Sequence, residues 1–323
     1  MQRGRPAGPV PVQVVNGAPA PAGGARADAT FRHDTHPRSF DDNRYVYAVL
    51  SRRAHGVSIG INLSPSRSCN FDCVYCQVDR SVPVTAAEHA VDEARLLAEL
   101  RDMLDAGRTG ILPARAREQG GPDASCRVAD VAFSGDGEPT AYARVPELVD
   151  EVLRLVAERL PGTRVTLITN ATLFHLPRVR AGLDALAARG GQVWAKLDAG
   201  TEATFRETNR SAVTFDRVLD NIREEALRHP LVVQSLFFRR GSSRPDGAEL
   251  DAWVQRLAAI VAAGGRLAGV QVTTVARRPP QPDVVALDEE TLLDIARRAR
   301  AALPGVPVEV FPSTYGAASG GRS

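Results

Sequence analysis

Short apolar runs alternate with longer amphipathic segments along most of this chain. The apolar runs are rich in Val, Ile and Leu and have the length of buried strands; they cover residues 57–64, 128–135, 164–170, 192–198, 231–238, 269–275 and 306–311. The intervening segments repeat apolar residues at helical spacing; they cover residues 83–107, 145–160, 176–189, 214–228, 248–264 and 288–303. Six successive strand–helix units predict an α/β fold with a parallel sheet.

Such a succession of units wraps toward a barrel, complete or partial, with its active site at the carboxyl ends of the strands. In the first predicted helix, we expect Thr85 to cap the start and Gly107 to end the last turn. The stretch 106–127 has no clear periodicity and predicts a long loop.

The two ends of the chain differ from the middle in composition. Residues 1–42 are rich in Pro, Ala and Gly and predict a disordered leader, because they cannot bury enough apolar surface. Residues 43–312 would form the folded domain, and residues 313–323 a flexible tail.

Composition excludes few function classes. The formal net charge is only +2 and aromatic residues make up 5%, so neither charge nor aromatic content favours tRNA or another nucleic acid as partner. No apolar run is long enough to cross a membrane, and the start lacks the apolar block of a secretory signal. We therefore expect a cytoplasmic protein whose four cysteines act as ligands or catalytic groups.

Three of these cysteines stand close together just after the first predicted strand. Cys69, Cys73 and Cys76 have the spacing C-x3-C-x2-C. Thiolates are the usual ligands of iron–sulfur clusters, and three ligands would leave one iron of a four-iron cluster open.

Two other interpretations of the triplet remain. A structural zinc site would need a fourth ligand, such as His55 or Cys126, and would make the protein a metal-stabilised scaffold that binds tRNA or another protein. A cluster used only for electron transfer would be expected to have a closed ligand set.

The triplet, with Tyr75 just before its third cysteine, resembles the signature of the radical S-adenosylmethionine (SAM) superfamily. The stretches SRR (51–53), SIGINL (58–63), FSGDGEPT (133–140) and ITNATL (168–173) resemble the group related to the wyosine-base (tRNA-modifying) synthases. This resemblance covers roughly residues 45 to 312 and implies a partial (β/α)6 barrel.

The resemblance also implies a cofactor chemistry. The three cysteines would hold a [4Fe-4S] cluster whose open iron chelates SAM, and one electron would cleave SAM to methionine and a 5′-deoxyadenosyl radical. The radical would then abstract a hydrogen from an unknown substrate. The electron would come from a donor such as flavodoxin or ferredoxin.

The remaining candidates follow the next three predicted strands. The turn Gly135, Asp136, Gly137 and Glu138 corresponds to the family's Gly-Gly-Glu-Pro turn, which binds the SAM amino group, although it could be an ordinary glycine-rich turn. Thr169 and Asn170 would face the ribose or carboxylate of SAM, with a turn or cap role for Asn170 as the alternative.

Lys196 is the chain's single lysine and lies on the same strand face as Asp198. Both would contact SAM, or else form a structural ion pair. Weaker candidates are Asn209, Arg210, Gln234, Gln271, Arg239 and Arg240. The wyosine synthases carry an additional upstream set of cysteines, and this chain has none before Cys69, which predicts a single cluster and argues against wyosine synthesis.

Overall fold

The computed structural model describes residues 40–313, apart from residue 82 and the segments 86–89 and 120–125. Most of the predicted leader and tail lie outside the described residues, so these two predictions remain predictions. Phe40, which the leader was expected to include, is buried in the core. No helix in the described part of the chain is long and apolar enough to span a bilayer.

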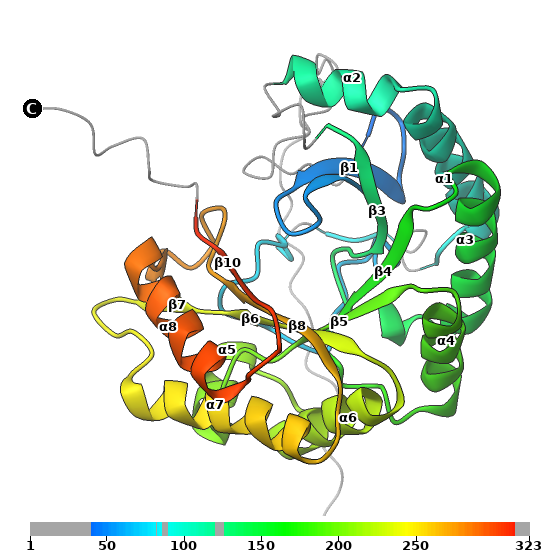
Figure 1. The fold of residues 1–323 in the computed structure, drawn as a ribbon. Coiled ribbons are helices and arrows are strands. Elements are labelled where there is room, and N and C mark those ends of the chain that lie inside the picture. The colour runs from blue at the N-terminus through cyan, green and yellow to red at the C-terminus, as the bar shows by residue number, and fades with distance from the viewer. Residues whose placement is uncertain (1–39, 82, 86–89, 120–125, 314–323) are drawn as a thin grey trace, which may run out of the picture.

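One curved sheet of eight strands forms the centre of the molecule (Figure 1). The strands follow one another in the order β1 (Val46–Ser51), β2 (Gly56–Ile61), β3 (Val128–Phe133), β4 (Arg164–Thr169), β5 (Gln192–Lys196), β6 (Leu231–Leu236), β8 (Leu267–Thr273) and β10 (Val308–Phe311). All neighbours pair in parallel except β1, which is antiparallel to β2.

Helices cover the outer, convex face of this sheet (Figure 1). They are α1 (Glu93–Arg108), α2 (Ile111–Glu118), α3 (Val145–Arg159), α4 (Pro177–Ala188), α5 (Glu202–Asn209), α6 (Phe215–Arg228), α7 (Gly247–Ala262) and α8 (Glu289–Ala302). The sheet curls without closing, since β1 and β10 do not pair. The predicted partial barrel of six β/α units is therefore confirmed.

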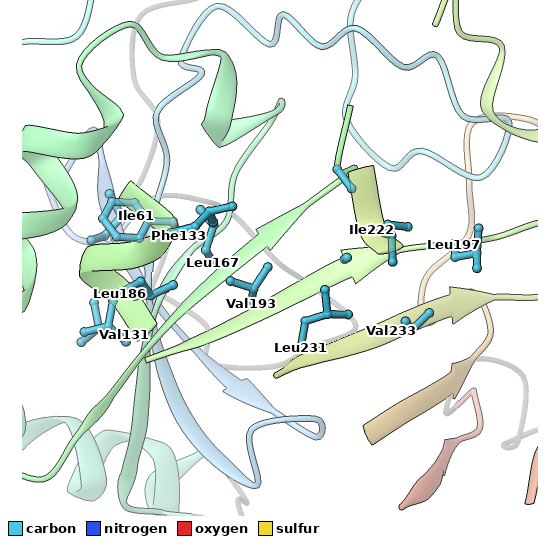
Figure 2. Close-up of a cluster of buried hydrophobic side chains, with 14 of the residues drawn as sticks. Ile61, Val131, Phe133, Leu167, Leu186, Val193, Leu197, Ile222, Leu231 and Val233 are labelled. Atoms are coloured by element: carbon cyan, nitrogen blue, oxygen red, sulfur yellow. The ribbon is translucent and has the colours of Figure 1, made fainter. Parts of the chain in front are cut away.

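Alternation along the strands separates an apolar outer layer from a polar interior. Ile61, Phe133, Leu167 and Val193 point outward and are buried among the residues that pack against the helices (Figure 2). Burial of one such side chain contributes roughly 1.5–3 kcal/mol. The alternate positions face inward and include polar side chains, so the interior can hold a polar ligand.

Several local predictions were wrong. Helix α1 starts at Glu93, where the side chain of Asp92 accepts a hydrogen bond from the Arg95 amide, and not near Thr85. It continues through Gly107, because the left-handed backbone that a glycine favours occurs at Gly110. Residues 111–118 form helix α2 and not a loop.

The elements missed by the sequence pattern lie outside the strand–helix repeat. They are β1, α5 and the two-stranded sheet of β7 (Phe238–Arg240) and β9 (Val284–Ala286). Each is short or breaks the alternation, so its local periodicity is weak.

The turn between β1 and β2 lies against the last strand. The ring of His55 contacts that of Phe311 at 6.1 Å, and its Nε2 lies 3.3 Å from the Glu309 carboxylate. The Arg52 guanidinium donates to the carbonyl of Pro312. Side chains, not strand pairing, therefore link the two edges of the sheet.

Candidate active site

A cavity of about 300 Å³ opens inside the curved sheet. All twelve residues predicted for the site line it, although they come from four separate stretches of sequence; these are Cys69, Cys73, Tyr75, Cys76, Gly135, Asp136, Gly137, Glu138, Thr169, Asn170, Lys196 and Asp198. The parallel strands bring these stretches together, because their carboxyl ends meet at one rim of the barrel.

The cysteine loop is anchored on α5. Backbone amides of Asp72 and Val74 donate to the carbonyls of Asn209 and Thr208, each at 2.9 Å. The anchor is a pair of hydrogen bonds to the last turn of a helix, whose carbonyls would otherwise lack partners. A helix that the sequence did not predict thus positions the metal-ligating candidates.

Each thiol of the triplet has a side-chain N–H donor. Nδ2 of Asn170 lies 3.9 Å from Sγ of Cys69, and Nδ2 of Asn209 lies 3.4 Å from Sγ of Cys73. Nη2 of Arg80 lies 4.0 Å from the Cys76 sulfur. Donors of this kind stabilise the negative charge of metal-bound thiolates.

Without a metal, burial opposes that charge. Burial raises the pKa of the Cys73 thiol to about 11, and it also raises the pKa of Cys69. The positive charge of Lys196 acts in the opposite direction at both thiols. The three cysteines are unpaired with one another, and a bound cation would provide the charge that favours their thiolate forms.

Neither proposed fourth ligand for zinc is near this loop. His55 is paired with Glu309, and Cys126 is buried in the main hydrophobic core. Neither residue lines the cavity. The three-cysteine loop therefore fits an inorganic cluster with an open position better than a closed zinc site.

The glycine turn packs directly against the cysteine loop. A Cβ at Gly137 would lie 1.9 Å from the carbonyl oxygen of Ser68, and one at Gly135 would lie 2.3 Å from Asn62. The Asn62 side chain binds Asp136 twice, donating to its carboxylate at 2.8 Å and accepting from its amide at 3.1 Å. Glycine is thus required at 137 so that the two loops can meet.

Glu138 is buried, and its carboxylate accepts hydrogen bonds from four groups of the protein. Its carboxylate accepts from the amide and hydroxyl of Thr140, the hydroxyl of Thr169 and the amide of Asn170. Burial raises the pKa of this carboxyl, and the four donors act in the opposite direction. Glu138 and Thr169 therefore tie the end of β3 to the end of β4.

Asn170 belongs to a polar network that fixes the cysteine loop to β4. Its Nδ2 donates to Oδ1 of Asn70 at 2.6 Å, and its Oδ1 accepts from the hydroxyl of Thr172 at 2.7 Å. The Asn70 amide in turn donates to Thr172. Asn70 was not among the predicted residues, although its position inside the triplet is a signal that could have found it.

Lys196 and Asp198 do not form the alternative ion pair. Asp198 accepts from the Tyr75 hydroxyl, the Asn209 amide at 3.1 Å and the Leu236 backbone amide at 2.9 Å. The ammonium of Lys196 lies 5.7 Å from the Tyr75 ring centre and has no hydrogen-bond or ion-pair partner in the described part of the chain. It faces the cavity as an available cation.

The weaker candidates divide between the cavity and the surface. Gln234 lines the cavity and donates to Gln271 at 2.9 Å, and both side chains are buried. Arg239 and Arg240 are exposed on β7, and Arg210 lies 3.8 Å from Asp72 outside the cavity lining.

A model of the radical SAM superfamily matches residues 63–228, about half of the chain. The chain belongs to the radical SAM superfamily. The matched residues include the cysteine loop, the glycine turn and the strands from β3 to β5.

Individual relatives are more distant. A UPF0026 protein of Helicobacter pylori strain J99 is 29% identical over 42% of this chain and 37% of its own length. A UPF0026 protein of Methanocaldococcus jannaschii is 28% identical over 60% of this chain and 55% of its own length. The chain thus spans only about a third to a half of the length of these relatives.

Solved structures support the same fold. A radical SAM methyltransferase from Sphaerobacter thermophilus is 14% identical and matches with a TM-score of 0.51, over 82% of this chain and 68% of that one. A structure of TYW1, a wyosine synthase, with a lysine–pyruvate adduct is 16% identical over 80% of this chain and 84% of that one, with a TM-score of 0.47. The family model confirms the predicted superfamily, and the methyltransferase structure supports its fold.

Proposed function

We propose that this protein reductively cleaves SAM at a [4Fe-4S] cluster held by Cys69, Cys73 and Cys76. The observation that carries the proposal is the loop itself: three thiols line one cavity, and each has a side-chain N–H donor. When bound, such a cluster supplies one electron to the SAM sulfonium, which breaks to methionine and a 5′-deoxyadenosyl radical.

The chain's own residues would bind and orient SAM. Lys196 faces the cavity, has no ion-pair partner among the described residues, and would pair with the SAM carboxylate, because an opposite charge stabilises a half-buried cation. Backbone groups of Gly135 and Asp136 would receive the amino group. Glu138 and Asp198 are already hydrogen-bonded and would hold the rim of the barrel in place.

Two further parts of the proposal concern partners. A small reduced protein such as flavodoxin or ferredoxin would deliver the electron. The hydrogen donor would be a substrate that enters the same cavity.

The test is anaerobic reconstitution with iron and sulfide, followed by dithionite and SAM. We expect acid-labile sulfide in the protein and 5′-deoxyadenosine in the reaction. Stoichiometric zinc without sulfide, or a reconstituted cluster that yields no 5′-deoxyadenosine, would contradict the proposal.

A separate test concerns cofactor binding alone. Lys196 is the single lysine of the chain, so acetic anhydride can modify one side-chain amine, whose acetylation mass spectrometry can follow. SAM should protect Lys196 from acetylation, whereas 5′-methylthioadenosine, which lacks the amino acid part, should not. Equal acetylation with and without SAM would remove Lys196 from the cofactor site.

A further inference from the structure

A second group of charged residues lines the cavity, and one of them, Arg277, reaches Gln77 at the end of the cysteine loop. Arg52, Arg53 and Arg277 all line it, and Asp130, also in the lining, is the acidic residue that acts electrostatically on Arg53. The three guanidinium groups and the one carboxylate act on one another electrostatically. This part of the cavity therefore carries an excess of positive charge.

Arg53 is the member without a conventional partner. Its side chain is half-buried and lines the cavity. No described residue accepts a hydrogen bond from it or forms an ion pair with it. Burial lowers the pKa of its guanidinium to about 10, and the neighbouring Arg52 adds to this effect. A half-buried cation with unused donors is stabilised by a ligand that supplies the missing acceptors.

The orientation of Arg53 is held by an aromatic ring. Its guanidinium carbon lies 5.7 Å from the ring centre of Trp194, within the range of a cation–π contact. Nε1 of Trp194 donates to Oε1 of Gln192 at 2.8 Å, which fixes the ring. A planar guanidinium held in this way can offer two parallel N–H donors to one oxyanion.

The other two arginines are already engaged. The Arg52 guanidinium donates to the carbonyl of Pro312, and Nε of Arg277 donates to Oε1 of Gln77 at 2.7 Å. Both add positive charge near Arg53. Arg53 is therefore the member of this group whose N–H donors a ligand would engage.

This group is distinct from the residues proposed to bind SAM. Trp194 is one inward-facing position before Lys196 on β5, about 7 Å nearer the amino end of the strand. The carboxylates near the cysteine loop are saturated by protein donors, as Glu138 and Asp198 show.

We propose that Arg53, with Arg52 and Arg277 beside it, binds a carboxylate or phosphate group of the substrate. The proposal rests on the proposed function and adds the substrate class: a small anionic molecule that enters the barrel. Lys196 would hold the SAM carboxylate, and Arg53 would hold the anionic end of the molecule that gives up its hydrogen.

The experiment measures anion binding to the reconstituted protein, with and without SAM, by calorimetry and thermal melting. The probes are inorganic phosphate and acetate, compared at constant ionic strength. The variants are Arg53→Met, Arg53→Lys and, as a control, Arg217→Met on the exposed face of α6. We expect saturating phosphate or acetate to raise the wild-type melting temperature by about 3 °C.

Arg53→Met should weaken, by at least about tenfold, the binding of whichever probe, phosphate or acetate, stabilises the wild type. Arg53→Lys should weaken this binding less. Arg217→Met should bind as the wild type does. The SAM dissociation constant should stay within about twofold in all variants. Arg53→Met should melt within a few degrees of the wild type, because the cation–π contact with Trp194 is lost but no protein hydrogen bond is.

Three results would overturn the proposal. In the first, neither anion binds the wild type, or both bind Arg53→Met equally well. In the second, Arg53→Met weakens SAM binding about tenfold, which would assign the guanidinium to the cofactor. In the third, Arg53→Met and Arg53→Lys both melt lower without a specific loss of anion binding. Anion binding needs no SAM cleavage, so a failure of the proposed function would be detected separately.

Discussion

The side-chain amide of Asn209 donates to the sulfur of Cys73 at 3.4 Å, although the two residues are 136 positions apart. The same nitrogen donates to Asp198 at 3.1 Å. Asn209 is the last residue of α5, whose carbonyls also hold the backbone of the cysteine loop. One side chain therefore joins the loop, a helix and the end of β5.

Substitution of Asn209 by Leu should change the reduction potential of the cluster more than the amount of iron bound. Loss of the N–H donor leaves more charge on the Cys73 sulfur, so the cluster's reduction potential should fall, on the order of tens of millivolts. A redox titration followed by electron paramagnetic resonance measures this potential. An unchanged potential, with iron content also unchanged, would show that the contact has no influence on the metal centre.

Substitution of Cys73 by Ala should abolish cluster assembly, while Cys126→Ala should not. Cys73 lines the cavity, whereas Cys126 is buried in the hydrophobic core. The core substitution should cost about 1 kcal/mol of folding stability and leave iron and sulfide content at the wild-type level. The measurements are metal and sulfide analysis and a melting curve. Retention of a SAM-cleaving cluster in Cys73→Ala would refute the ligand assignment.

Gly137→Ala should displace the cysteine loop, because the added Cβ would lie 1.9 Å from the Ser68 carbonyl. We expect a loss of about 2 kcal/mol or more and impaired cluster assembly. The matched control is Gly247→Ala in the first turn of α7, where a Cβ meets nothing within 4 Å. That change should be neutral or slightly stabilising. Equal effects of the two substitutions would contradict the packing argument.

The rate at which Cys73 is alkylated in cluster-free protein should keep rising with pH beyond the pH at which an ordinary thiol is fully ionised. Burial raises the pKa of this thiol to about 11, so the thiolate fraction should rise about tenfold per pH unit between pH 8 and 10. The free energy of unfolding should fall over the same range. The thiol has its ordinary, lower pKa in the unfolded chain, so it loses its proton there at a lower pH than in the folded protein. Iodoacetamide labelling with peptide mass spectrometry measures the rate, and a plateau near pH 9 would be inconsistent with this burial.

Lys196→Met should raise the SAM dissociation constant about tenfold or more, with little change in melting temperature. The substitution removes a charge that has no ion-pair partner among the described residues, so little stabilisation is lost. Equilibrium dialysis with labelled SAM measures the affinity. Unchanged affinity combined with a lower melting temperature would assign Lys196 a structural role.

The repeating part of the fold could be predicted because its signal is local. Each buried strand and each amphipathic helix carries its own periodicity, and six repeats leave few arrangements. The antiparallel strand β1 and the helix α5 were missed because they do not follow this alternation. Their positions are determined by contacts with distant parts of the chain, such as those between α5 and the cysteine loop.

The candidate site shows the same limit. The cysteines were found from their spacing, the glycine turn from the family resemblance, and Lys196 as the single lysine within a predicted strand; all of them line the cavity. The sequence left open whether Lys196 pairs with Asp198, since the answer depends on where Tyr75 lies. Arg53 was named only within a motif, because its contact with Trp194 joins residues 141 positions apart in a curled sheet.

The link between the turn after β1 and the strand β10 has a mechanical consequence. A continuous ladder of main-chain hydrogen bonds resists separation along its whole length, whereas this seam depends on a few contacts of Arg52 and His55, each contributing about 1 kcal/mol. The barrel therefore resists separation least between the β1–β2 turn and β10. A bulky molecule that entered the barrel would break these contacts first and leave the spacing of the cysteine loop unchanged.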